Sequence, residues 1–178
     1  ILDIGCGTGM LLKTLQGQIS NQSLGIDISE VAIGYAKKNG INAKHFNLFD
    51  DDFNTLGHFD YITCFEVIEH IQNSEYLLLL LLKHFPNSQI IFSIPNTGFI
   101  FSRLRLLIGR VPIQWVIHPG EHIRFWTKKD MDRTLKSLGF NILDCTPSRI
   151  NSIFTRSFPG LFAESLIYHI ELNKARSQ

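Results

Sequence analysis

Short apolar runs alternate with segments of helical periodicity along the first 96 residues of the chain. The apolar runs predict buried strands at 1–4, 23–27, 42–47, 59–65 and 88–94. The periodic segments predict helices at 10–17, 29–40 and 74–85, with Ser29 capping the second helix and Gly40 ending it. Because parallel strands are joined by long crossovers, this order predicts a parallel sheet with helices on both faces. Such sheets bind ligands at the carboxyl ends of their strands.

The pattern changes after residue 97. Residues 98–119 contain no clear strand, whereas 127–139 predict a helix that Thr127 caps and Gly139 ends. Segments at 141–148 and 164–172 predict the last two strands. A length of 178 residues fits one domain, so we expect a single α/β doubly wound domain over 1–178.

Charge and cysteine content narrow the function classes. The formal net charge is +1, which makes no strong case for a nucleic-acid partner. The charge is unevenly spread, since 1–96 hold 5 Lys/Arg against 10 Asp/Glu and 97–149 hold 9 against 4.

The longest apolar run, 76–82, is far shorter than the roughly 20 residues that span a bilayer. Three scattered cysteines, with no C-x-x-C pair and no signal peptide, predict a cytoplasmic, reducing setting.

A glycine-rich turn follows the first predicted strand. Asp3, Gly5, Gly7 and Gly9 form D-x-G-x-G-x-G between that strand and the first helix. Glycine permits positive φ angles and close approach of a ligand, and the following helix start offers N–H groups to an anionic group. Asp27 ends the second strand, where a carboxylate can accept both hydroxyls of a ribose. This order and spacing favour a nucleotide-type site over a glycine turn and a strand-end Asp of no consequence.

These segments together resemble the class I S-adenosylmethionine-dependent methyltransferases. Four motifs of that family match ILDIGCGTG, GIDIS, FDYITCFEVIEHI and IIFSIPN, and the resemblance runs from Ile1 to about Phe140. It implies a Rossmann-like sheet of seven mostly parallel strands, the last antiparallel, and S-adenosylmethionine as cofactor. The chain begins inside the first strand, so we expect a fragment without the one or two helices that usually precede it in the family.

The resemblance also implies which residues hold the cofactor. Asp3, Gly5 and Gly7 would line its methionine portion, Asp27 would hold the ribose, and Ile28 would pack on the adenine. The remaining members of the implied set are Cys6 and Gly9 in the glycine turn, Asn47 and Leu48 at the adenine edge, and Phe65, whose backbone would meet the cofactor amino group. The family more often has Asp where this chain has Asn47.

The stretch FEVIEHI, residues 65–71, places Glu66, Glu69 and His70 at the end of the fourth strand. Their i, i+3, i+4 spacing would put all three on one face of a helix, well placed to align an acceptor and take its proton. Alternatively, the carboxylates could simply stabilise the first turn of that helix.

His122 joins these three residues in a pattern that resembles the E-x-x-E-H plus distal His set of the small-RNA 3′-terminal 2′-O-methyltransferases, where the set binds a divalent metal. Ubiquinone-biosynthesis O-methyltransferases have a similar E-x-x-E-H. Two carboxylates and two imidazoles suit a divalent cation. Three interpretations remain open: a metal site, a metal-free site with His70 or His122 as base or orienting group, and a structural cluster.

Residues 97–126 form an insert that we expect to cap the acceptor side. Within the family it most resembles the MetW-like and surface-polysaccharide-associated branch. Apolar residues at 100, 101, 104, 107 and 108 share one helical face, which indicates either a cap over the acceptor pocket or, for 99–110, peripheral membrane contact.

These observations favour methyl transfer from S-adenosylmethionine to oxygen of a small-molecule or carbohydrate-like acceptor. One alternative is an RNA-end 2′-O-methyltransferase with a divalent metal, although the chain has no recognisable RNA-binding module. The other is a cofactor-binding regulatory partner in methionine biosynthesis, for which the MetW-like branch is the model.

Overall fold

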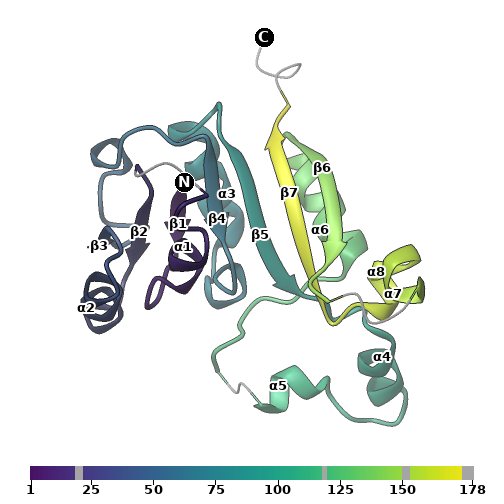
Figure 1. The fold of residues 1–178 in the computed structure, drawn as a ribbon. Coiled ribbons are helices and arrows are strands. Elements are labelled where there is room, and N and C mark those ends of the chain that lie inside the picture. Colours follow the sequence, from purple (N-terminus) through teal and green to yellow (C-terminus); the bar gives the residue numbers. More distant parts are fainter. Residues whose placement is uncertain (19–21, 118–119, 150–152, 174–178) are drawn as a thin grey trace.

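A computed structural model describes residues 1–18, 22–117, 120–149 and 153–173 and contains a seven-stranded sheet (Figure 1). The strands run in the order β3-β2-β1-β4-β5-β7-β6. The parallel strands are β1 (Leu2–Ile4), β2 (Leu24–Asp27), β3 (Ala43–His45), β4 (Tyr61–Cys64) and β5 (Gln89–Pro95). β7 (Ser165–Leu172) is antiparallel to both β5 and β6 (Phe140–Pro147). The predicted doubly wound, mostly parallel fold with an antiparallel last strand is confirmed.

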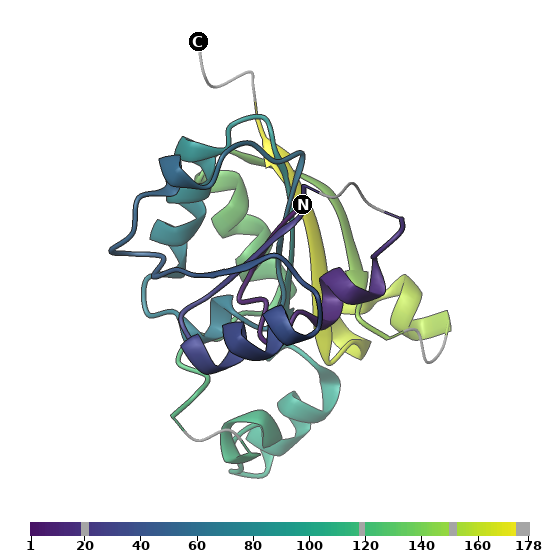
Figure 2. The same ribbon diagram turned by 60° about the vertical axis from the view of Figure 1, so that its left-hand side comes forward.

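Helices cover both faces of the sheet. α1 (Met10–Thr14) and α2 (Glu30–Lys38) connect strands that step one way from β1, whereas α3 (Ser74–His84) connects β4 to β5 in the opposite direction. Because such crossovers are right-handed, the two sets of helices lie on opposite faces. α6 (Lys128–Ser137) lies with α3 on one side of the strands (Figure 2). The direction changes between β1 and β4, and ligands bind at such a switch point.

Two apolar cores correspond to these two faces. The larger core joins the sheet to α3 and α6, through side chains such as Leu77, Leu81 and Leu135. The smaller core lies under α1 and α2 and includes Leu12 and Ile33. Ser29 caps α2 as predicted, since its side chain accepts the N–H of Ala32.

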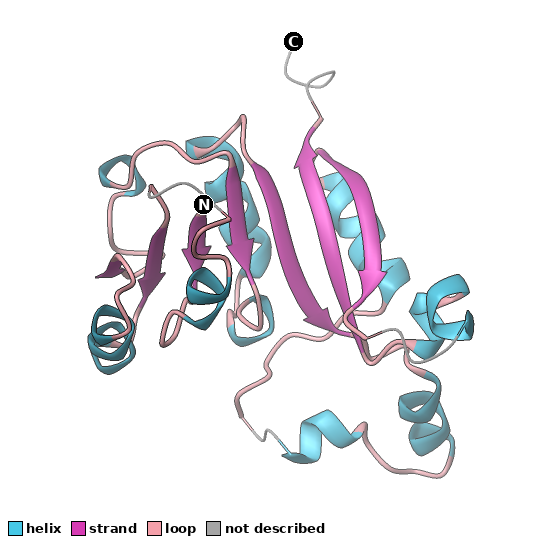
Figure 3. Cartoon of the chain, in the orientation of Figure 1, coloured by secondary structure: helices cyan, strands magenta, loops and turns pink. Residues whose placement is uncertain are grey.

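Short helices also lie at or beyond the carboxyl ends of the parallel strands (Figure 3). We name residues 98–117 the arm; it contains α4 (Ile100–Leu107) and α5 (Ile113–Ile117). α7 (Ile153–Ser157) and α8 (Pro159–Phe162) precede β7 and were not predicted. Among the described residues, no helix is long and apolar enough to cross a membrane.

One local prediction was wrong. Residues 66–70 do not begin an α-helix: Glu66 has a left-handed backbone with φ 54°, and only Ile68–His70 form a short 3₁₀ helix. A left-handed residue cannot continue a right-handed helix, so the expected i, i+3, i+4 face is absent. Gly40 ends α2 as predicted, since it follows the cap residue Asn39 with φ 79°.

Asn96, directly after β5, ties α8 and the arm to the sheet. Its side chain is completely buried. The amide nitrogen donates to the carbonyl oxygens of Ala163 at 2.8 Å and Gly160 at 3.1 Å, and the amide oxygen accepts the N–H of Gly98 at 3.0 Å. One buried amide therefore joins the end of β5 to residues 160–163, which lie more than 60 residues away in the sequence.

Asp3 is a buried carboxylate on β1. It is 4% exposed and accepts the hydroxyl of Thr63, its neighbour on β4, at 2.7 Å. Burial raises the pKa of Asp3 to about 6, although the Thr63 hydroxyl opposes the rise. The Asp3 carboxyl therefore loses its proton at a higher pH in the folded protein than in the unfolded chain.

Replacing Asn96 with alanine should lower the free energy of unfolding by about 2–4 kcal/mol, because three buried backbone groups lose their partner together. Urea denaturation measures this change. The matched control is Asn141→Ala, at an exposed position on β6, which should shift stability by less than about 0.5 kcal/mol. Equal losses in the two variants would contradict the role given to Asn96.

Asp3 should make the stability of the ligand-free protein pH-dependent. Folding raises the pKa of Asp3 from 3.8 to about 6. The contribution of Asp3 to the free energy of unfolding is therefore full below pH 3.8 and is lost as the pH rises through about 6. Asp3→Asn should therefore gain about 3 kcal/mol relative to wild type between about pH 4 and about pH 8. Chemical denaturation of both proteins across this range measures the difference, and a difference independent of pH would contradict it.

Candidate functional site

The loop between β1 and α1 folds back onto the end of β2. Gly5, Gly7 and Gly9 have φ angles of 68°, 53° and 79°. The N–H groups of Gly5 and Cys6 donate to the carbonyl oxygen of Ile26 at 2.8 and 3.0 Å. A Cβ atom on Gly5 would lie 2.3 Å from Cγ2 of Val67, so the backbone angle and the packing both require glycine there.

The Asp27 carboxylate lies between this loop and the start of α2. Oδ2 accepts the N–H of Gly7 at 2.9 Å, and Oδ1 accepts the N–H of Ser29 at 2.8 Å. These bonds fix the carboxylate at the carboxyl end of β2. A carboxylate has about four acceptor positions, so two bonds leave capacity for ligand hydroxyls.

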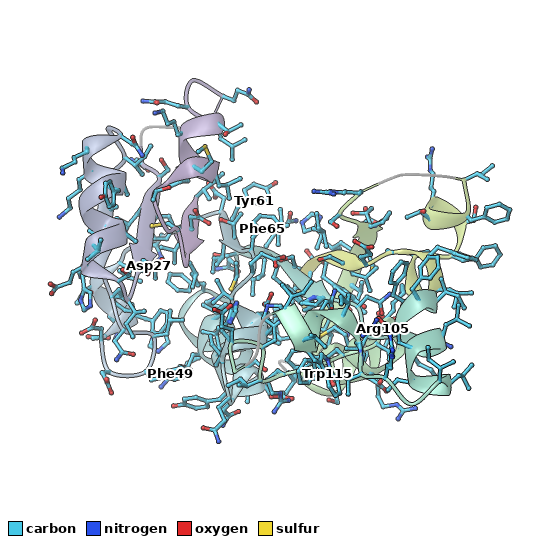
Figure 4. The ribbon with its side chains drawn as sticks, turned by 90° about the horizontal axis from the view of Figure 1, so that it is seen from below. Asp27, Phe49, Tyr61, Phe65, Arg105 and Trp115 are labelled. Carbon is cyan, nitrogen blue, oxygen red and sulfur yellow. The ribbon has the colours of Figure 1, made fainter. Side chains whose placement is uncertain are left out.

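A cavity of about 350 Å³, which we call cavity A, opens at the carboxyl ends of β1, β2 and β4. Its size suits a small-molecule ligand. Five of the predicted cofactor residues line it: Gly5, Asp27, Ile28, Asn47 and Leu48. Figure 4, viewed from below, shows Asp27 and Phe49 on the side away from the arm residues Arg105 and Trp115.

The other five predicted cofactor residues do not line cavity A. Asp3 and Cys6 are buried, Gly7 and Gly9 belong to the loop backbone, and Phe65 follows β4.

Sequence reasoning missed several apolar residues of cavity A. Phe46, Phe49 and Ile71 line it, and Phe49 is 48% exposed, with its ring stacked 6.2 Å from that of Tyr76. The available signal was the apolar pair Leu48 and Phe49 directly beyond the third strand, where a ligand was expected. A ring exposed in this position is free to contact a flat ligand.

Glu66 has an unusual backbone that Ser93 of β5 holds in place. Among the described residues, Glu66 is the sole non-glycine residue with positive φ. Its N–H donates to Oγ of Ser93 at 2.8 Å, and the Ser93 hydroxyl donates to Oε1 of Glu66 at 2.8 Å. Such conformations cost of order 1–3 kcal/mol and concentrate at functional sites.

Glu69 is a completely buried carboxylate. Within the described part of the chain, neither of its oxygens meets a hydrogen-bond donor. Burial raises the pKa of Glu69 well above its usual range, and the nearby Glu66 carboxylate adds to the rise. A buried carboxylate without a donor is unfavourable unless a proton or a cation compensates it.

Backbone hydrogen bonds bring His122 close to Glu69, although the two residues are 53 positions apart in the sequence. The N–H groups of Ile123 and Arg124 donate to the carbonyl oxygen of Glu69 at 2.9 and 3.1 Å. Arg124 also forms an ion pair with Glu75 of α3. Residues 121–124 are thereby docked on the 3₁₀ helix that carries Glu69 and His70.

The two imidazoles meet edge to face, with ring centroids 4.9 Å apart. Nδ1 of His70 lies 2.8 Å from the carbonyl oxygen of Glu121. Because a carbonyl only accepts, Nδ1 carries the proton, and Nε2 keeps its lone pair in the neutral ring. This is the arrangement that orients histidines as metal ligands or as bases.

Three of the four residues predicted as metal ligands converge. Glu69, His70 and His122 each offer one ligand atom, and these atoms lie within 4.8 Å of one another. Glu66 is outside this group, and one of its oxygens is engaged by Ser93. The donor set is therefore one carboxylate and two imidazoles, a combination suited to divalent transition metals.

A second cavity of about 630 Å³, cavity B, lies on the far side of this cluster. Glu66 lines both cavities, His70 lines cavity A, and His122 lines cavity B. Phe99 and Gln114 of the arm also form part of its wall. The cluster of ionisable side chains therefore stands where the two cavities adjoin.

Comparison with known proteins places this geometry in a family. A family model described as a methyltransferase domain matches residues 1–144. A ubiquinone biosynthesis O-methyltransferase of Rickettsia conorii is 32% identical over 121 residues, which cover 65% of this chain and 42% of that relative. The chain thus spans less than half the length of this relative.

Solved structures share the fold. The small RNA methyltransferase HEN1 superposes with a TM-score of 0.71 at 22% identity, covering 97% of this chain and 23% of HEN1. PKMT2 from Rickettsia typhi in complex with AdoHcy superposes with a TM-score of 0.63 at 18% identity, covering 97% of this chain and 48% of PKMT2. With the glycine loop and Asp27 bordering cavity A, the chain belongs to the methyltransferase domain family and has the fold of the class I S-adenosylmethionine-dependent methyltransferases.

Proposed function

We propose that the protein transfers the methyl group of S-adenosylmethionine to a hydroxyl oxygen of a small-molecule acceptor. The observation that carries this proposal is Glu66, which lines both cavities. Cavity A would hold the cofactor and cavity B the acceptor, so the methyl group would cross beside Glu66. The name of the Rickettsia conorii relative, an O-methyltransferase, supports oxygen as the receiving atom.

In cavity A, Asp27 would accept the ribose hydroxyls and the exposed side chain of Ile28 would pack on the adenine. The main-chain turn at Gly5 would leave room for the methionine portion. These roles are supported by the fixed Asp27 carboxylate and by the position of Gly5 in the wall of cavity A. The sulfonium would then point toward Glu66 and His70.

The reaction is an in-line displacement. The acceptor oxygen forms a bond to the methyl carbon, the carbon–sulfur bond breaks, and its electron pair stays on sulfur, which becomes a neutral thioether. The acceptor must lose a proton, and Nε2 of His70 or an imidazole nitrogen of His122 would take it. Most of the acceleration would come from alignment of the two cavities.

A divalent cation fits the cluster of Glu69, His70 and His122. The buried Glu69 carboxylate, with no donor facing it among the described residues, is the observation that favours a cation. Such a cation would lower the pKa of a bound hydroxyl. Without it, the same imidazoles would act as the base, and Glu69 would remain protonated.

The size of cavity B favours a small or carbohydrate-like acceptor. A volume of about 630 Å³ lies within the range of small-molecule pockets. An RNA end is the competing acceptor, and a salt-dependent gel shift with short RNA would favour it.

The three cysteines are free, which supports the predicted cytoplasmic setting.

Asp27→Ala should weaken the binding of S-adenosylhomocysteine roughly 10- to 100-fold, because a charged acceptor of ribose hydrogen bonds is lost. Isothermal titration calorimetry of both proteins measures this change. Asp144→Ala, on β6, is the matched control and should bind like wild type. Binding that is equally strong in all three proteins would refute the assignment of cavity A.

The metal site makes a separate prediction. After removal of metal and equilibrium dialysis against Co²⁺, the protein should hold about one equivalent per chain. Glu69→Gln and His122→Ala should each lower the affinity for Co²⁺ roughly 100-fold or more. His58→Ala, in the loop before the amino end of β4, should leave this affinity unchanged. Elemental analysis and the visible spectrum of Co²⁺ report the result without an activity assay. Methyl transfer that persists without bound metal would assign the chemistry to the imidazoles alone.

A further inference from the structure

The arm presents its apolar side chains to solvent. In α4, Phe101, Leu107 and Ile108 just beyond it are 62%, 81% and 71% exposed, whereas Ser102 is 4% exposed. An amphipathic helix on a globular protein in water has the reverse orientation. The apolar face predicted from residues 100, 101, 104, 107 and 108 therefore exists, but most of it faces outward.

The exposed surface continues into α5, where Val116 and Ile117 are 54% and 61% exposed. More of the exposed large apolar side chains come from the arm than from any other segment among the described residues. Neither α4 nor α5 packs extensively on another element, and both project beyond the carboxyl end of β5 (Figure 1). A contiguous apolar surface of this kind indicates a partner.

The charge of the arm indicates which partner. Residues 97–117 contain Arg103, Arg105 and Arg110 and no Asp or Glu. The Nε groups of Arg103 and Arg105 donate to the carbonyl oxygens of Gly98 at 2.6 Å and Val111 at 2.8 Å, so two of the cations are held close to the helices. Apolar side chains interleaved with fixed cations match an anionic lipid surface.

The ends of the described chain lie away from the arm. β1 begins, and β7 ends, on the side of the sheet that is opposite the arm, where the parallel strands start (Figure 1). The apolar side chains of α4 and α5 are therefore not covered by either of these strands.

We propose that the arm docks on the surface of an anionic bilayer. Leu107, Ile108 and the exposed side chains of α5 enter the interfacial region, and the arginines meet the lipid head groups. Since Phe99 and Gln114 line cavity B, docking holds that cavity close to the lipid surface. This binding does not depend on the proposed reaction, because it uses the arm alone.

Co-sedimentation with vesicles tests the proposal. The protein should bind vesicles of phosphatidylcholine with roughly one third phosphatidylserine at about 50 mM salt, and much less at about 500 mM, where charges are screened. Vesicles of phosphatidylcholine alone should bind it at least roughly 10-fold more weakly.

Two matched variants identify the surface. Leu107→Gln, Ile108→Gln and Arg110→Gln together should weaken vesicle binding roughly 100-fold, since two inserted side chains and one cation are lost. The control is Val31→Gln, Tyr35→Gln and Lys38→Gln on α2, where Val31 is 71% exposed, as Ile108 is. It should bind like wild type. Circular dichroism and the affinity for S-adenosylhomocysteine verify that both variants are folded.

Three results would overturn the proposal. The first is no binding to anionic vesicles at low salt. The second is an equal loss of binding in the two triple variants. The third combines two findings: the wild-type protein binds no vesicles, and it forms a dimer in solution that the arm variant does not form. That result would assign the surface to a second copy of the chain.

Discussion

The close approach of two loops at the centre of the sheet is the constraint on which the site depends. β1 pairs with β4, so the glycine loop and residues 65–71 leave the sheet side by side. Val67 then approaches Gly5 so closely that the Cβ atom of any other residue would overlap it. The same contact places Glu66 next to cavity A. The glycine requirement therefore follows from packing and from the positive φ angle together.

The second constraint is electrostatic. Glu69 is buried without a donor, beside a second carboxylate and two imidazoles. Burial of a lone carboxylate costs several kcal/mol unless it is neutralised. This unfavourable carboxylate lies at the junction of the two cavities. A change in its protonation, or a cation bound to it, would therefore act directly on a group in either cavity. Residues 121–124, anchored to the carbonyl oxygen of Glu69, complete the cluster from a distant part of the chain.

The sequence was sufficient for the features that local physics determines. The alternating strands and helices of the first half, the positive φ angles of the glycine loop and the Ser29 cap each depend on residues close together in the chain. The backbone of Glu66 could not be predicted, because Ser93, 27 residues away, determines it. Helical periodicity predicted α4 but not the direction of its apolar face, which depends on what surrounds the helix. α8 was missed because Asn96 holds its position through long-range hydrogen bonds.

The order of strands has a consequence for synthesis on the ribosome. β7 is the last described strand of the chain, yet it lies between β5 and β6. Until it emerges, β5 has an unpaired edge and β6 has no place in the sheet, so the nascent chain carries an exposed apolar β-strand edge, which favours aggregation. The half that contains the glycine loop and Asp27 has all of its own strand partners much earlier. Vectorial synthesis therefore divides this sheet into an early half, which carries the glycine loop and Asp27, and a late half that is completed only when β7 emerges.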